Sequence, residues 1–391
     1  MNFNTIIGQA ARQEDFFPRP KITSEIWSKL DKGSNLLLVA PRRVGKSSLL
    51  FNLLDKPKNN HIVVYYTSES VNNLNEFYKK LFHHVLEILQ GKQKYKAKAS
   101  AFSKDFISRI KEIGLADFNL TFGESSFQYL NELNNLLSHI ELGNDKLIIL
   151  IDEFAQTVEN IIRDSDEKSA ILFLQAKREI RQAPQLAKKI QFVYAGSIGL
   201  ENIVSRINGI NFINDLTPIP VSPLSISESK QLIDKIIDDS NVSIEDEVID
   251  YLLNTIEWHI PFYFQIILDE AAKILTDKNS TQLTKEVIDK SVEYALKQRI
   301  YFEHWFTRLR NAYKGSEFSF VKELLNLASD KKTIPSTEIF NLAVKYKLEN
   351  FYTDLVNALK HDGYINNNDE PKTYRFNSPL LRQWWYNNVA N

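Results

Sequence analysis

The chain has 391 residues, enough for two or three domains, and 43% of them are apolar, so a sizeable core can be buried. Its formal net charge of -1 excludes a general electrostatic attraction of the whole molecule to nucleic acid. It has no cysteine, which excludes disulfides and zinc–thiolate sites and fits a reducing cytoplasm. The N-terminus shows no secretory signal, and no stretch reaches the ~18–20 consecutive apolar residues of a membrane span. We therefore expect a cytoplasmic protein without membrane contact.

Five short segments are predicted to be strands of one sheet. Most are continuous apolar runs, the pattern of strands that are buried on both faces. They comprise residues 36–40, 61–66, 147–151, 190–195 and 219–221. Helical sequence lies between them, over residues 47–54, 71–140 and 165–182. Strands that alternate with helices predict an α/β fold with a parallel sheet.

The pattern changes after Pro223. Residues 225–300 are predicted to be helical only, with a polar loop at 276–280. Residues 301–391 are predicted to form two or three helices and then a small hairpin that contains Tyr374–Phe376, which is the order of elements in a winged helix. We expect an amphipathic helix over 284–310 to join these two parts. The predicted domains are therefore an α/β core (1–222), a helical domain (223–300) and a winged helix (301–391).

A phosphate-binding loop is predicted between the first strand and the first helix of the core. The pattern is G-x-x-x-x-G-K-[ST] between a buried strand and a helix, and here alanine replaces the first glycine. Gly45 would let the backbone approach a phosphate, Lys46 would supply charge, and the hydroxyl of Ser47 would bind Mg²⁺. The candidate ATP-binding residues of this segment are Ala40, Pro41, Arg42, Arg43, Val44, Gly45, Lys46, Ser47 and Ser48. Ala40 fits only if its φ is negative, because a Cβ disfavours the left-handed region.

Two carboxylates follow the third predicted strand. Asp152 is placed to hold Mg²⁺ through water, and Glu153 to orient and deprotonate the attacking water. Taken alone, the pair would equally suit a solvated turn, and the upstream loop favours the catalytic interpretation. Ser197 follows the fourth strand, where its hydroxyl would sense the γ-phosphate or would be an ordinary serine at a strand end.

These segments together resemble the archaeal-type ATPase family, P-loop ATPases close to STAND and origin-recognition AAA+ proteins. The matching segments are Phe16–Arg19, Ala40–Ser47, Ile151–Phe154, Ala195–Ser197 and Tyr374–Arg382. The resemblance implies a nucleotide-binding core with an extra central strand, a helical lid over residues 223–300 and a winged helix. It also implies ATP and Mg²⁺ as cofactors.

The resemblance places four further residues near the nucleotide. Phe17 and Arg19 match the segment near the adenine, with Pro18 in place of a glycine. Pro261 matches the proline of the lid motif, although its glycine is missing. Arg206 is the candidate arginine finger, and the alternative is a surface cation on a helix. Without a clear finger, which can contribute 10³–10⁵ in rate, we expect slow hydrolysis of the kind a molecular switch uses.

The partner is open to two interpretations. The predicted recognition helix, Asn350–Asp362, has only Lys360 and His361 against Asp354 and Asp362, whereas a helix that binds DNA usually carries several cations. This favours a switch that acts through a protein partner, and self-association stays open. The alternative is a DNA-binding AAA+-like loader or regulator that uses the basic segment 92–111, which would otherwise be a solvated insert. Its cations are Lys92, Lys94, Lys96, Lys98, Lys104, Arg109 and Lys111.

Overall fold

A computed structural model of the chain describes residues 3–112, 129–196 and 199–390. The chain forms two compact units, and each is described by itself. The core unit contains residues 12–39 and 46–220, and the C-terminal unit contains residues 1–11, 40–45 and 221–391. The first residues of the predicted phosphate-binding loop therefore pack with the C-terminal unit.

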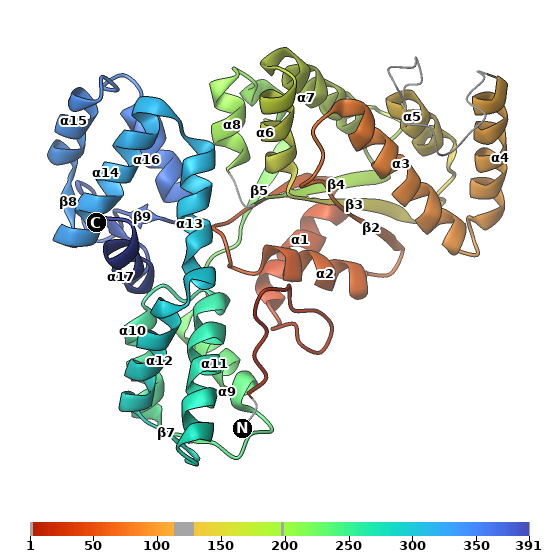
Figure 1. Cartoon of the computed structure of the whole chain (residues 1–391). Coiled ribbons are helices and arrows are strands. Elements are labelled where there is room, and N and C mark those ends of the chain that lie inside the picture. The colour runs from red at the N-terminus through yellow and green to blue at the C-terminus, as the bar shows by residue number, and fades with distance from the viewer. Residues whose placement is uncertain (1–2, 113–128, 197–198, 391) are drawn as a thin grey trace. The chain divides into compact units, whose positions relative to one another are not determined.

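A five-stranded parallel sheet organises the core unit (Figure 1). Its strands are β1 (Asn35–Val39), β2 (His61–Thr67), β3 (Lys146–Asp152), β4 (Ile190–Ala195) and β5 (Leu216–Pro220). The order is β2-β3-β4-β1-β5, and every neighbouring pair is parallel. All residues from Leu147 to Ile151 are buried, as expected of a strand covered on both faces. The predicted α/β fold with a parallel sheet is confirmed.

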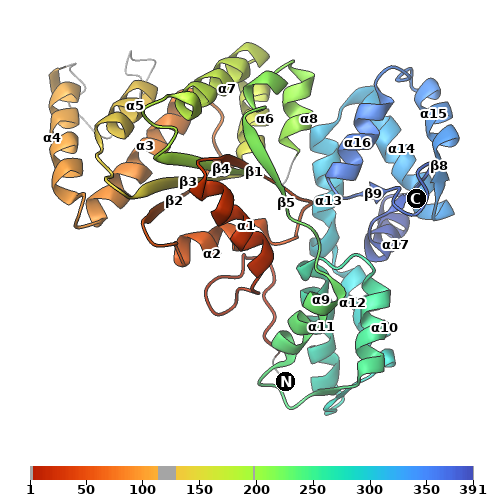
Figure 2. The ribbon, with the colours of Figure 1, turned by 180° about the vertical axis from the view of Figure 1, so that it is seen from behind.

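Helices cover both faces of this sheet. The helices described in the core unit are α1 (Pro20–Asp31), α2 (Lys46–Asp55), α3 (Leu74–Gly91), α4 (Lys96–Glu112), α5 (Tyr129–His139), α6 (Phe154–Asp164), α7 (Glu167–Gln182), α8 (Leu200–Arg206) and the short 3₁₀ helix η1 (Ile210–Phe212). Helices α1 and α2 lie on one face, and α6 and α7 lie on the other, as both views show (Figures 1 and 2).

Helix α4 contains most of the basic segment, which lies in the region predicted to be helical. An extended chain would place the alternating lysines of 92–98 on one side, but a helix begins at Lys96. Tyr95, Ala99 and Phe106 are all buried at helical spacing, and α4 packs on α3. Burial of this apolar stripe favours the helix over the extended form.

The C-terminal unit begins with four helices. They are α9 (Ile226–Ile237), α10 (Asp246–Ile256), α11 (Pro261–Asp277) and α12 (Lys285–Lys297). A capping box between Ser225 and Glu228 starts α9. The expectation of helices only is wrong in detail, because two segments of two residues each pair as parallel strands, β6 (Ser243–Ile244) and β7 (Gln282–Leu283).

The single helix expected over 284–310 is instead two helices. Helix α12 ends at Lys297 and α13 (Arg299–Ala312) begins after Gln298, whose backbone is extended. The buried stripe of α12 ends at Leu296, and Ile300, which would continue it, is 78% exposed. The loss of that stripe removes the packing that would favour one continuous helix.

The rest of the C-terminal unit combines four helices with a small antiparallel sheet. The helices are α14 (Gly315–Lys331), α15 (Ser336–Lys345), α16 (Tyr352–His361) and α17 (Pro379–Asn388). The strands β8 (Ile334–Pro335), β9 (Ile365–Asn366) and β10 (Thr373–Phe376) lie in the order β8-β10-β9. Trp305, Trp384 and Trp385 are fully buried in this unit. Among the helices that the structure describes, none is long and apolar enough to cross a membrane.

Candidate nucleotide-binding site

The strand order locates a candidate ligand site at the carboxyl ends of β1 and β4, which are neighbours inside the sheet. After β1 the chain continues to β2, the outer strand on one side of the sheet. After β4, the neighbour of β1, it continues to β5, the outer strand on the other side. Neighbouring strands whose connections diverge in this way open a crevice outside their carboxyl ends, where α/β proteins bind ligands. The segment that follows β1 is the predicted phosphate-binding loop.

The loop has the backbone conformation that its sequence suggests. Gly45 has φ +97°, which strongly favours glycine, and Arg43 has φ +65°. Ala40 is not among the described residues with positive φ, so this prediction is confirmed. Lys46 starts α2 and is 7% exposed, Val44 is buried, and Ser48 is half-buried in the first turn. The amide groups of a helix start can bind an anion directly.

Within the core unit, the structure brings the first turn of α2 to the end of β3. Ser47 Oγ donates a hydrogen bond of 2.8 Å to Oδ2 of Asp152, and these two residues are the predicted metal ligands. Tyr65 of β2 donates a second hydrogen bond of 3.1 Å to the same oxygen. The backbone N–H of Glu153 donates to Oδ1 over 3.0 Å. A hydroxyl and a carboxylate at this distance are the hard oxygen ligands that Mg²⁺ prefers.

The carboxylate of Asp152 is held in an unfavourable environment. Its residue is 3% exposed, and burial raises the pKa, with the charge of Glu153 adding to the shift while the Ser47 and Tyr65 hydrogen bonds oppose it. Burial also raises the pKa of Tyr65 far above its ordinary value. A buried carboxylate that is short of positive charge is well prepared for a cation.

Glu153 adopts a strained backbone at the start of α6. Its φ of 56° and ψ of 31° place it in the left-handed region, and its side chain is half-buried. Such outliers cost free energy and gather at functional sites. Ser197, the other predicted catalytic residue, lies outside the described residues.

The remaining predicted residues are divided between the units. In the core unit, Arg19 is buried before α1 and Phe17 is half-buried. Arg206 at the end of α8 donates to Glu159 of α6 over 2.7 Å, with 47% of its side chain exposed. In the C-terminal unit, Pro261 is the first residue of α11, a position that suits proline.

Comparisons with known proteins agree with this geometry at the level of the fold. No protein-family model and no curated protein matches the chain. The Walker-type ATPase PABY2304 of Pyrococcus abyssi matches over 97% of this chain and 98% of its own, with 18% identity and a TM-score of 0.63. The ORC2 protein of Aeropyrum pernix, solved in ADPNP–ADP complexes, matches over 95% and 92%, with 11% identity and a TM-score of 0.54. This chain has the fold of a P-loop ATPase.

Sequence reasoning missed several residues that contact the P-loop segment inside the C-terminal unit. The guanidinium of Arg43 lies over the ring of Phe262 in α11, 4.5 Å from its centroid. A Cβ on Gly363 would lie 2.8 Å from Cβ of Pro41 and 2.6 Å from Cη2 of Trp258. Tyr65 was missed in the core unit. No local pattern marks these residues, because only the folded chain brings them to their partners.

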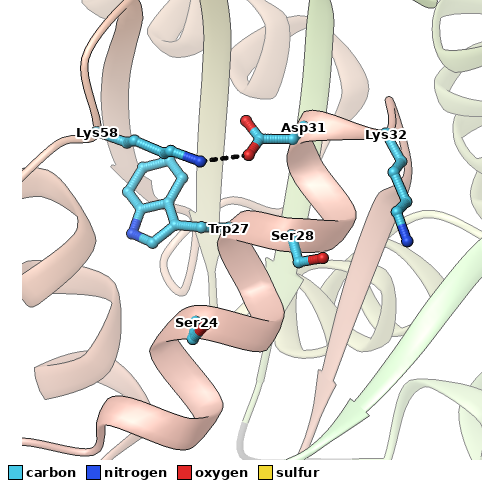
Figure 3. A pocket seen from close by; sticks show the side chains of 6 residues that line it. All are labelled: Ser24, Trp27, Ser28, Asp31, Lys32 and Lys58. Atoms are coloured by element: carbon cyan, nitrogen blue, oxygen red, sulfur yellow. Dashed lines mark hydrogen bonds and ion pairs between the residues drawn. The ribbon is translucent and has the colours of Figure 1, made fainter.

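A separate hollow of about 540 Å³ lies on α1 (Figure 3). Its lining includes Trp27 and the ion pair between Lys58 and Asp31. Lys58 precedes β2 and Asp31 precedes β1, so the hollow lies at the amino ends of the strands. The predicted phosphate-binding loop follows the carboxyl end of β1, so this hollow is separate from the candidate nucleotide site.

The basic segment is partly neutralised by its neighbours. Lys94 donates to Asp145 over 2.9 Å, and Lys98 is paired with Glu141. Lys92, Lys96 and Lys104 are exposed, while the side chains of Arg109 and Lys111 lie outside the described ones. Two of the predicted DNA-binding cations thus already have carboxylate partners.

Proposed function

We propose that this chain binds Mg-ATP at the P-loop and hydrolyses it slowly. The hydrogen bond between Ser47 and Asp152 carries the proposal, because it joins the predicted metal ligands across 105 positions of sequence. Lys46 and the amides of the loop would bind the phosphates, with Phe17, Arg19 and Pro261 near the base. Ser47 and Asp152 would hold Mg²⁺, which supplies charge neutralisation on the phosphates when bound.

Hydrolysis would depend on Glu153. Its carboxylate would accept a proton from the attacking water, and its strained backbone is the observation that supports a functional role. Ser197 would complete the site as the γ-phosphate sensor. Arg206 would act as a finger in a neighbouring molecule only after leaving Glu159, so its ion pair supports slow turnover by the isolated chain.

We infer that the output is a conformational switch. In this interpretation residues 1–222 are the ATPase core, 223–300 are the lid and 301–391 are a winged helix. Ligand-bound phosphate loops and their surroundings change conformation with nucleotide state in many switches. The C-terminal unit would respond through the loop residues 40–45 that pack within it.

A protein partner suits the winged helix better than DNA does. Phe340 and Val344 on one face of α15 are 44% and 49% exposed, and Phe351 before α16 is 61% exposed. Two cations of the same domain, Lys345 and Arg375, are paired with carboxylates. Exposed apolar side chains typify protein contacts, whereas DNA affinity depends on free cations.

Titration of the purified chain with ATP in the presence of Mg²⁺ tests the proposal. We expect Lys46→Ala to lower ATP affinity at least ~100-fold, since a charged contact to two phosphates is removed. Lys56→Ala is the matched control, because Lys56 is exposed beyond the end of α2. Unchanged ATP affinity in Lys46→Ala would refute the P-loop assignment.

A DNA titration at low and high salt tests the alternative. Binding through phosphate contacts weakens steeply with salt, so a DNA-binding protein shows a strong mobility shift at low salt that disappears as salt rises. We expect no shift at low salt. A salt-sensitive shift that Lys92→Ala and Lys96→Ala weaken would favour the DNA-binding alternative.

A further inference from the structure

A cluster of buried nitrogen donors lies beside the loop residues of the C-terminal unit. Arg308 of α13 has a side chain that is 8% exposed. Its Nε, Nη1 and Nη2 are buried and make no hydrogen bond among the described residues. Nη2 lies 3.1 Å from Oδ1 of Asp362, the residue after α16, so one carboxylate balances its charge.

His304 lies one turn before Arg308 on the same helix. Both of its ring nitrogens are buried and have no hydrogen-bond partner among the described residues. Burial lowers the pKa of this imidazole to about 2, and the charges of Arg42, Arg43 and Arg308 add to the effect. The ring is therefore neutral at pH 7, with one N–H to donate.

Aromatic contacts fix Arg43 in relation to this histidine. The guanidinium of Arg43 stacks on Phe262, and the Phe262 ring meets the His304 ring edge-on with centroids 6.4 Å apart. Nε of Arg43 is also buried without a hydrogen-bond partner among the described residues. A rigid stack of this kind holds a donor in place without satisfying its hydrogen-bonding capacity.

Among the described residues, the cluster has more positive charge and more donors than the carboxylate of Asp362 can satisfy. Buried donors without partners are costly, and buried guanidinium groups need anions. We propose that Arg43, His304 and Arg308 form an oxyanion site that binds a phosphate group, with Asp362 occupying Arg308 when phosphate is absent. Planar guanidinium groups suit two-point binding of phosphate oxygens, and the imidazole N–H would add a third contact.

Two sources could supply the phosphate group. One is the terminal phosphate of ATP, because Arg43 belongs to the P-loop; this source rests on the proposed function. The other is free inorganic phosphate. In either case the anion would compete with Asp362 for Arg308, and so would release the end of α16 from α13.

Calorimetric titration with ATP, ADP and inorganic phosphate separates the sources. If the ligand is the terminal phosphate, Arg308→Gln and His304→Gln lower ATP affinity about tenfold or more and change ADP affinity by less than about twofold. If it is free phosphate, the wild-type chain binds inorganic phosphate and Arg308→Gln abolishes that binding, with ATP affinity unchanged. Asp362→Asn removes the competing carboxylate, and we expect it to raise affinity for the same anion by about threefold or more.

Two controls keep the test decisive. Arg310→Gln changes an exposed arginine on the same helix and should alter none of the affinities. Arg308→Gln alone leaves Asp362 buried without this arginine, which could destabilise the fold. The double variant Arg308→Gln/Asp362→Asn removes both charges. It should unfold cooperatively, as a folded protein does, and should still fail to bind the anion.

Wild-type affinities for ATP, ADP and phosphate in both Arg308 variants would overturn the oxyanion site. If the wild-type chain binds neither nucleotide, the proposed function fails, and the phosphate titration alone then decides this inference.

Discussion

Ser47 Oγ lies 2.8 Å from Oδ2 of Asp152, and this hydrogen bond joins the first turn of α2 to the end of β3 in the core unit. Tyr65 reaches the same oxygen from β2. Three elements thus converge on one buried carboxylate, and the arrangement leads to specific expectations for stability and turnover.

Replacing Glu153 separates binding from hydrolysis. Glu153→Gln should lower ATP turnover by about 10²–10⁴ because the amide cannot accept the proton of the attacking water. ATP affinity should change by less than about twofold, since the proposed phosphate ligands are intact. Phosphate release and nucleotide titration measure the two quantities. Glu179→Gln, at an exposed position of α7, is the control, and equal turnover in both variants would remove Glu153 from the mechanism.

Asp152 should make stability depend on pH. Its pKa in the folded chain is raised above the ordinary value of 3.8, so the folded state binds a proton more readily than the unfolded state does. Asp152→Asn should therefore have a higher free energy of unfolding than the wild type at pH 7. The advantage should shrink as pH falls through the raised pKa and vanish below 3.8. Urea unfolding between pH 3 and 8 tests this, and an advantage that is independent of pH would contradict it.

Gly363 should be sensitive to a single methyl group. It follows α16 with φ +88°, and a Cβ would lie 2.6 Å from Trp258 and 2.8 Å from Pro41. Gly315 is the matched control, because it also has a positive φ, +54°, but no atom within 4 Å of the added carbon. Gly363→Ala should cost about 1–3 kcal/mol more unfolding free energy than Gly315→Ala, the usual range for overpacking. Equal losses of unfolding free energy in the two variants would contradict this prediction, because they would show that small shifts of the neighbouring atoms relieve the crowding.

Lys177 of α7 should destabilise the core unit at neutral pH. Its Nζ is buried among aromatic rings, 4.4 Å from the centroid of Phe192, with no hydrogen-bond partner among the described residues. Burial, and then the charge of Arg181, lowers its pKa well below 10.5. Lys177→Met should therefore stabilise the protein by about 1–4 kcal/mol at pH 7, as when buried charges are replaced by apolar side chains.

The size of the Lys177 effect on unfolding free energy should change with pH in a defined way. The unfolded state holds the proton up to 10.5, so the cost of burying Lys177 declines as pH rises toward that value. The advantage of Lys177→Met in unfolding free energy should thus be smaller at pH 10 than at pH 7. Lys168→Met changes an exposed lysine on the same helix and should show neither effect. A constant advantage across this range would contradict the lowered pKa of Lys177, because it would show that folding does not change the proton affinity of this lysine.

Local patterns predicted most of the core unit. The predicted strand segments correspond to β1 to β5, and α2 begins at Lys46 directly after the turn at Gly45. Both features depend on residues that are adjacent in sequence, so a local pattern can predict them. Asp152 was identified because it directly follows a buried run. Less periodic regions were predicted less well: β6 and β7 were missed, and the break at Gln298 was not expected.

The sequence by itself determined the strand–loop–helix unit and the chemical types at the candidate site, since these depend on neighbours along the chain. Only the tertiary structure decided which side chains meet. Tyr65 reaches Asp152 through the pairing of β2 with β3, and His304 and Arg308 gather with Arg43 through the packing of α11, α13 and α16. Contacts between residues distant in sequence depend on how the whole chain buries its apolar surface, so a local sequence pattern cannot predict them.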